Sequence, residues 1–144
     1  MSATFVDISA AIGARLALIT GAGQPLVNVY DYFNAKIENY PAATYQANGY
    51  VGSTLTTTDN RRTFNFTVNI VQEFENRTLD QAVAGLYEAV DAAVKILEAD
   101  ATLDGNVDFF ETTVGAMFMD ESSEGAIIYM QIEIRAVAEV NISS

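Results

Sequence analysis

The stretch TFNFTVNIVQEF, residues 63–74, constrains the fold more than any other part of the chain. Apolar residues occupy every second position in its first half, and polar residues lie between them. Successive side chains of a β-strand point to opposite faces of a sheet, so this alternation predicts a strand with one buried face and one polar face. The residues expected in the core are Phe64, Phe66, Val68 and Ile70.

Two segments show the spacing of three and four residues that is typical of amphipathic helices. The first covers residues 4–20, and the second follows Thr78, which forms a capping-box pattern with Gln81. The first segment is unusual because the side opposite its main apolar stripe is also apolar. That second side consists of Ala10, Ala14, Ala17 and Leu18. We expect a neighbouring subunit to cover it, since a helix at a protein surface normally carries a polar face.

Shorter alternating segments predict further strands around these elements. They lie at residues 26–32, from Tyr45 to Val51, at 107–119 and at 126–140. The order of helix, strands, helix and strands predicts an α+β fold. We expect residues 1–144 to form a single domain, with a mainly antiparallel β-sheet and two α-helices packed on one face.

The composition argues against several classes of function. The chain has no histidine and no cysteine, so the commonest general base, the usual zinc ligands and a thiol nucleophile are all missing. It also has no Ser-x-x-Lys pattern and no phosphate-binding loop. We therefore expect no enzymatic activity and no bound cofactor. No apolar run reaches the roughly 18 residues that a membrane-spanning helix needs, so we expect no membrane insertion.

Charge is distributed unevenly along the chain. Residues 1–72 contain four acidic and four basic residues, whereas residues 73–144 contain fifteen acidic and three basic residues, which accounts for the net charge of −12. Positions 98–124 hold eight acids and no base, namely Glu98, Asp100, Asp104, Asp108, Glu111, Asp120, Glu121 and Glu124. We expect one negative region of surface, which repels nucleic acid.

The most specific local motif is DATLDGNVDFFE, residues 100–111, which resembles the calcium loop of an EF-hand. The residues that match loop positions 1, 5, 6, 9 and 12 are Asp100, Asp104, Gly105, Asp108 and Glu111. The segment after the motif is rich in β-branched residues, which favours a strand where an EF-hand needs a second helix. We expect no metal site here. A small acidic calcium-binding protein remains the alternative function.

A polar stretch, STLTTTDNRR at residues 53–62, separates two of the expected strands. We expect it to be a projecting loop, because it is too polar for a core and too long for a tight hairpin. Its two adjacent arginines suit an acidic partner. The candidate interface residues are Asp59, Arg61 and Arg62 of this stretch and Tyr30 and Tyr32 of an earlier aromatic segment.

Five segments follow one another in a characteristic order, namely NVYDYF, NYPAATYQ, the stretch that ends in NRRTFNFTVNIVQE, TLDQAVAGLYEAVDAAVKIL and DATLDGNV. Their order and spacing cover most of the chain and resemble the tail terminator, or tail completion, proteins of long-tailed bacteriophages. In the last segment, Leu103, Gly105 and Val107 match a structural turn of that family. The resemblance therefore offers a second interpretation of the calcium-like motif.

The resemblance implies a structural virion protein and not an enzyme. Members of the family form hexameric rings that cap the growing tail tube and later join the head connector, and DNA passes through the ring on ejection. We accordingly expect a homo-oligomeric ring that contacts the tail tube protein and the neck and lets DNA pass without specific binding. Its place would be the head-proximal end of the virion tail and, during assembly, the host cytoplasm. The eight acids would face the lumen. Another head–tail connector component is a further alternative.

Overall fold

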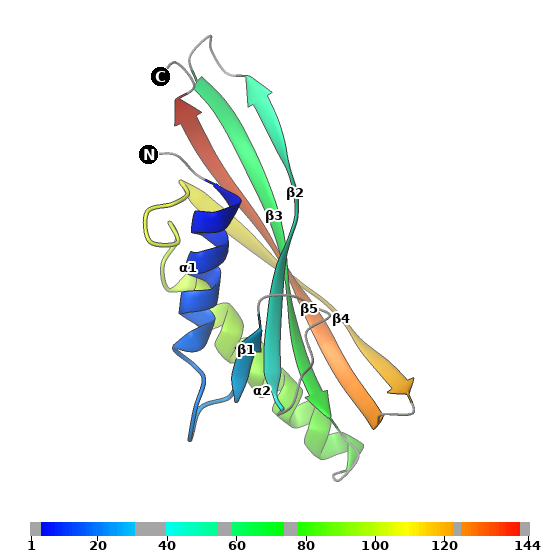
Figure 1. Ribbon diagram of the computed structural model, residues 1–144. Helices are drawn as coiled ribbons and strands as arrows, with labels where there is room; N and C mark the ends of the chain where they lie inside the picture. Colours follow the sequence, from blue (N-terminus) through cyan, green and yellow to red (C-terminus); the bar gives the residue numbers. More distant parts are fainter. Residues whose placement is uncertain (1–3, 31–39, 55–58, 74–77, 123–124, 142–144) are drawn as a thin grey trace.

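The computed structural model describes residues 4–30, 40–54, 59–73, 78–122 and 125–141. In chain order the elements are α1 (Phe5–Ala17), β1 (Asn28–Tyr30), β2 (Ala42–Thr54), β3 (Asp59–Glu73), α2 (Leu79–Glu98), β4 (Phe109–Ser122) and β5 (Gly125–Asn141). The strands form one sheet in the order β1-β2-β3-β5-β4, and both helices lie on one face of it (Figure 1). Neighbouring strands are antiparallel except β1 and β2, which are parallel. The expected α+β fold is confirmed.

β3 lies between β2 and β5 and supplies the centre of the core, as its alternation predicts. Phe64, Phe66, Val68 and Ile70 are all buried in the core between the sheet and the helices. Phe5 of α1 packs edge-to-face on two of them, with ring centroids 5.1 Å from Phe64 and 5.9 Å from Phe66. This aromatic cluster fixes α1 over the middle of the sheet.

Both helices begin where their capping residues indicate. The side chain of Thr4 accepts a hydrogen bond from the backbone N–H of Asp7, and the expected capping box opens α2. α1 ends at Ala17, earlier than expected, because the chain tightens into a turn in which N–H groups bond carbonyls only three residues back. The second apolar side of α1, from Ala10 to Leu18, is exposed to solvent.

The described part of the stretch 53–62 is strand and not projecting loop, contrary to expectation. β2 continues to Thr54 and β3 begins at Asp59, and the two strands pair up to Thr54 and Asn60. Threonine is β-branched and favours extended backbone, which the polarity of the stretch concealed. A polar strand is stable here because the ends of β2, β3 and β5 extend beyond α1, where no apolar core has to be filled (Figure 1). Residues 55–58 lie outside the described part of the chain.

Candidate assembly surfaces

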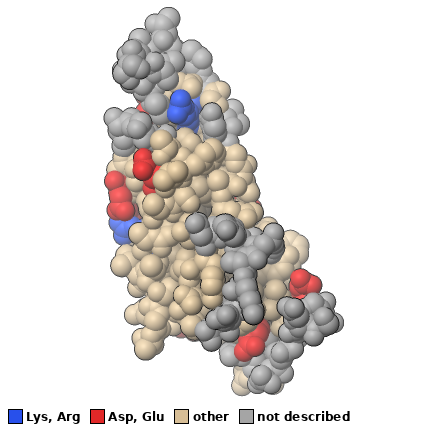
Figure 2. Space-filling model, viewed as in Figure 1, with Lys and Arg blue, Asp and Glu red and all other residues tan. Residues whose placement is uncertain are grey.

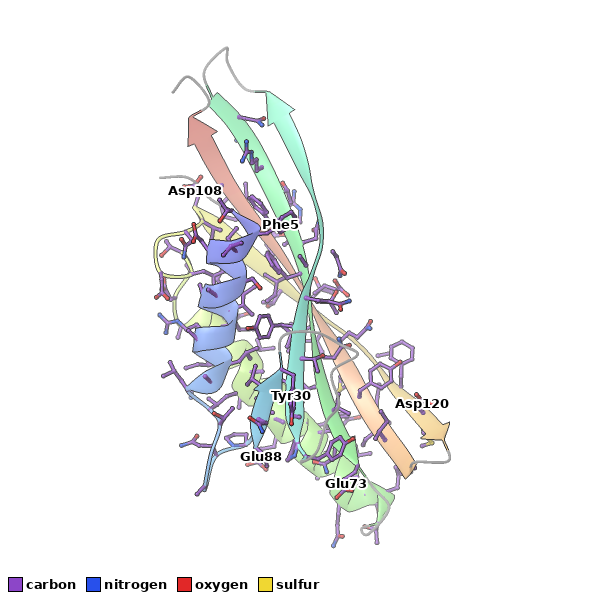
Figure 3. The ribbon with its side chains drawn as sticks, viewed as in Figure 1. Phe5, Tyr30, Glu73, Glu88, Asp108 and Asp120 are labelled. Atoms are coloured by element: carbon purple, nitrogen blue, oxygen red, sulfur yellow. The ribbon has the colours of Figure 1, made fainter. Side chains whose placement is uncertain are left out.

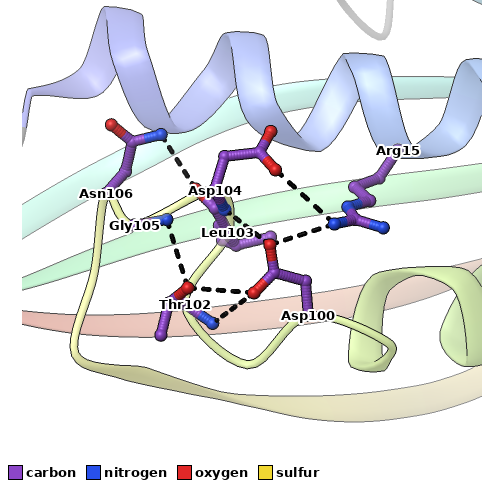
Figure 4. Close-up of polar contacts among 7 residues, drawn as sticks. All are labelled: Arg15, Asp100, Thr102, Leu103, Asp104, Gly105 and Asn106. Carbon is purple, nitrogen blue, oxygen red and sulfur yellow. Dashed lines mark hydrogen bonds and ion pairs between the residues drawn. The ribbon is translucent and has the colours of Figure 1, made fainter.

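The turn between α2 and β4 is organised around the carboxylate of Asp100 (Figure 4). One of its oxygens accepts hydrogen bonds from the N–H and the hydroxyl of Thr102, at 3.1 and 2.9 Å. The other accepts from the N–H of Asp104 at 2.8 Å and from the guanidinium of Arg15 at 3.0 Å. Leu103, Asp104 and Gly105 all have positive φ, so the chain reverses sharply within this network. The network ties the turn to α1.

These donors hold the pKa of the Asp100 carboxyl well below its usual range. The largest contributions come from the backbone N–H groups of Asp104 and then Thr102, followed by the Thr102 hydroxyl. Arg15 lowers the pKa further, while partial desolvation acts in the opposite direction. Asp100 is therefore an ionised carboxylate whose acceptor sites are already used by its own turn and by α1.

The other acids of the calcium-like motif point to separate partners. Asp108 accepts a hydrogen bond from the backbone N–H of Glu139 at 2.9 Å, and Glu111 lies 3.7 Å from Arg135. β4 begins at Phe109, so the motif runs into a strand where an EF-hand continues into a helix. In the described part of the chain, no three acids converge on a point where a metal ion could bind. The structure thus favours the reading of this segment as a structural turn.

We expect the wild-type protein to show no one-site calcium binding tighter than about 10 µM, the range of calcium sensors. The reason is that the Asp100 carboxylate is occupied within the turn and that Asp108 and Glu111 have partners on β5. The measurement is a calorimetric titration of chelator-treated protein. Glu111→Gln serves as the control and should give the same trace. A one-site isotherm that Glu111→Gln abolishes would establish a calcium site at residues 100–111.

The acids expected to form one negative surface do not gather in one region of the described structure. Asp108 and Asp120 lie at opposite ends of β4 (Figure 3), and Figure 2 shows the acidic side chains of one face in areas separated by uncharged surface. Glu98, Asp100 and Asp104 belong to the end that adjoins Asp108. The expectation of a single region is therefore wrong, because an extended strand separates residues that are close in sequence. Glu121 lies in β4, and Glu124 lies outside the described residues.

The candidate interface residues are also dispersed. Arg61 lies 3.5 Å from Glu139 of β5 in an exposed ion pair, and Arg62 beside it on β3 is half-buried. Such exposed pairs contribute about 0–1 kcal/mol to stability, so this contact leaves the arginine accessible to another acid. Asp59 begins β3 opposite the end of β5. Tyr30 ends β1, near the other end of the sheet (Figure 3), and Tyr32 lies outside the described residues.

Exposed apolar side chains, which sequence reasoning missed as a surface, lie along both faces of β4. Phe109, Val114, Phe118 and Met119 are each 43–49% exposed. A groove of about 330 Å³ runs beside this strand on the helix side of the sheet. It is lined by Tyr87, Val90 and Asp91 of α2, Val114 of β4 and Met130 of β5. The available sequence signal is that residues 109–122 carry apolar side chains on both strand faces without any Lys, Arg or Pro.

Comparison with known proteins identifies no family for this chain. No protein-family model matches the chain, and no curated protein is significantly similar to it. Among the described helices, neither is long and apolar enough to cross a membrane.

Proposed function

We propose that the protein is a tail terminator of a long-tailed phage, which forms a six-membered ring on the head-proximal end of the tail tube. The observation that carries the proposal is the second apolar side of α1, which consists of Ala10, Ala14, Ala17 and Leu18 and is exposed in the single chain. Val6, one turn before Ala10, is exposed as well. A contiguous apolar surface on a soluble protein marks an interaction site. This exposed surface, together with the order of motifs that resembles tail terminators, supports a subunit whose apolar side of α1 is covered by a neighbouring subunit in the ring.

A tube of identical subunits has no intrinsic end, because every layer offers the next layer the same surface. A terminator has to match the symmetry of the tube on one side and present a different surface to the neck on the other. A rigid α+β subunit fulfils this task by closing into a ring through a heterologous contact, in which one surface of each copy meets a different surface of the next. The cap then provides contacts for both the tail tube protein and the head connector.

The helix-free face of the sheet is the surface that we assign to the lumen. By the alternation of β4 and β5, Glu111, Asp120, Glu133 and Glu139 lie on this face. Arg135 on the same face is paired with Glu111 at 3.7 Å, and Arg61 is paired with Glu139 at 3.5 Å. The acids outnumber the bases here, so DNA would pass without being held. Glu98 ends α2, and Asp100, Asp104 and Asp108 lie between α2 and β4, so we do not assign these four acids to the lumen.

We expect deletion of the gene from its phage to give tails of uncontrolled length, or finished tubes that do not join heads. Electron microscopy of lysates measures both outcomes. Complementation with wild-type protein should restore normal tails, and complementation with Ala14→Glu should fail, because a charge is placed on the apolar side of α1. Ala22→Glu is the matched control, since Ala22 is an exposed alanine of the turn after α1. Normal-length tails joined to heads in the deletion would refute the proposed function.

A further inference from the structure

Arg62 is a half-buried arginine that lacks a partner within the described part of the chain. Its Nε atom is buried and has no hydrogen-bond partner, and none of the described ion pairs involves it. The other described arginines each form an ion pair with an acid of the chain, at 3.0, 3.5 and 3.7 Å, namely Arg15, Arg61 and Arg135. Arginine stays protonated at any physiological pH, so burial of part of its guanidinium without an acceptor destabilises the single chain. Arg62 is therefore suited to an acceptor that another molecule supplies.

The neighbours of Arg62 in the sheet supply no carboxylate. Arg62 lies on β3 opposite Gly52 of β2 and Ala138 of β5. By the alternation of β3, its side chain lies on the same face as Phe64, the face that carries the helices. Phe64 contacts Phe5 in the first turn of α1, at a ring-centroid distance of 5.1 Å. Arg62 therefore belongs to the strand ends that extend beyond α1 (Figure 1).

Asn60 has a second polar atom without a partner on the same strand face. Its Oδ1 atom is buried and accepts no hydrogen bond in the described structure. A Cβ atom on Gly52 would lie 3.3 Å from Nδ2 of Asn60, so the missing side chain of Gly52 gives the amide its space. Asn60 and Arg62 are two residues apart on β3 and therefore lie side by side on one face. The surface thus offers a charged donor and a neutral acceptor, and its complement is a carboxylate next to an N–H group.

We propose that a carboxylate of a neighbouring copy binds Arg62 in the ring. The inference rests on the proposed ring and names one contact between its subunits. Each chain carries 19 acidic and 7 basic residues, so copies of it repel one another, and an interface between them needs a base to oppose an acid. A guanidinium binds a carboxylate through two parallel hydrogen bonds. Arg62 supplies the base, and the main-chain N–H beside the acid supplies the donor for Asn60.

Arg62 acts in opposite directions in the single chain and in the ring. In the single chain its charge is partly desolvated and uncompensated, which costs stability. In the ring the charge is paired at a partly buried site that salt screens poorly, which strengthens the contact. A residue with a structural role behaves differently, because its loss weakens the fold of the single chain. The stability of the subunit and its assembly therefore respond differently to removal of this charge.

Arg62→Met removes the charge and keeps most of the aliphatic side chain. We expect the urea midpoint of the isolated subunit to stay the same or to rise. We expect the protein concentration at which half of it is assembled to increase at least about tenfold. Sedimentation velocity measures assembly, at high protein concentration or on tail tubes. Lys95→Met is the matched control, since it removes the same charge from an exposed position near the end of α2, and it should leave assembly nearly unchanged.

Two results of this experiment would overturn the proposal. One is assembly of folded Arg62→Met at the same concentration as the wild type. The other is a lowered urea midpoint of its isolated subunit, since Arg62 would then support the fold and not the contact. If the wild-type protein forms rings that this substitution leaves intact, only the contact is wrong. If the wild-type protein forms no ring at high concentration or on tail tubes, the proposed function fails as well.

Carbodiimide cross-linking identifies the acid that binds at this position. Arg62→Lys places an amine there, which the reagent joins to a carboxylate in direct contact. Assembly from a mixture of isotope-labelled and unlabelled chains marks the links between copies, because the two linked peptides then differ in labelling. We expect residue 62 to be joined to one acid of another copy in the assembled fraction and not in the monomer. Links of residue 62 that stay within its own chain would contradict the proposal.

Exchange of the two charges tests whether the pairing is direct. Arg62→Glu should abolish assembly, because it places two acids opposite each other. Combination with an arginine at the acid that the cross-link identifies should restore assembly. An arginine at an acid that is not cross-linked is the control and should restore nothing. A folded protein with the exchanged pair that still fails to assemble would show that the two side chains do not bind each other.

Discussion

Replacement of Phe66 by alanine is expected to lower the free energy of unfolding by about 3–5 kcal/mol. The side chain of Phe66 is 0% exposed, lies on the central strand and packs against the ring of Phe5. Its removal loses the transfer free energy of a buried ring and leaves a cavity where helix and sheet meet. Since domains are stable by only about 5–15 kcal/mol, the loss is a large fraction of the total. Urea unfolding followed by circular dichroism measures it.

Phe109→Ala is the matched control for this experiment. It removes the same side chain from a site that is 47% exposed, so the expected loss is about 1 kcal/mol in the monomer. The thermal midpoint should fall by roughly 10 °C for Phe66→Ala and much less for the control. Equal effects of the two substitutions would mean that Phe66 does not lie at the centre of the core.

Local physical rules made the central strand and both helix starts predictable from sequence. Alternation identified Phe64, Phe66, Val68 and Ile70 because a strand between two neighbours and under two helices has to bury one face. The capping box of Thr78 and Gln81 is predictable for a similar reason, since it needs only residues within one helical turn. The exposed second side of α1 was visible as well, because helical periodicity places its residues without any knowledge of the rest of the chain.

The predictions that failed depend on which strands become neighbours. Residues 53–62 are polar enough for a loop, yet β3 is paired with β2 up to Asn60 and with β5 up to Asp59. The prediction that the acids of residues 98–124 form one negative surface was wrong. Residues that are close in sequence lie far apart along an extended strand, and β4 places Asp108 and Asp120 at its opposite ends. The place of β4 at the end of the strand order follows only from the topology of the sheet, which no local pattern specifies.

The turn after α2 shows how one motif supports two readings. The residue types of an EF-hand loop and of a tight, hydrogen-bonded turn overlap, since both use aspartates and a glycine with positive φ. The hydrogen-bond partners of the aspartates distinguish the calcium loop from the structural turn. Here Asp100 bonds its own turn and Arg15, and Leu103 is fully buried in the core beneath it. Arg15 lies 85 residues away in sequence, so this contact was beyond the reach of local reasoning.

Asp100→Asn is expected to destabilise the protein at neutral pH and to lose that effect in acid. The pKa of Asp100 is lowered in the folded state from its ordinary value of 3.8, because N–H and hydroxyl donors of the turn and Arg15 favour the ionised form. A group with a lowered folded-state pKa contributes stability that is fully present above the unfolded-state pKa. That stability is lost as the pH falls through the folded-state pKa. Asparagine keeps the shape of the side chain but supplies no charge at any pH.

The difference in urea midpoint between the wild type and Asp100→Asn should therefore be constant from about pH 7 to pH 5 and narrow progressively below about pH 4. Taking the difference between two otherwise identical proteins removes the contribution of the remaining acids, which titrate in both. Glu88→Gln is the control, because the described structure shows no hydrogen bond or ion pair for this exposed side chain of α2, and it should leave the midpoint nearly unchanged throughout. A difference for Asp100→Asn that stayed constant down to about pH 2 would contradict the argument, since the contribution would then come from the shape of the side chain and not from its charge. If the difference in urea midpoint decreases in acid for Asp100→Asn and not for Glu88→Gln, the stabilisation comes from the charge of Asp100. The ionised carboxylate, bound by its own turn and by Arg15 of α1, then stabilises the connection between α2 and β4.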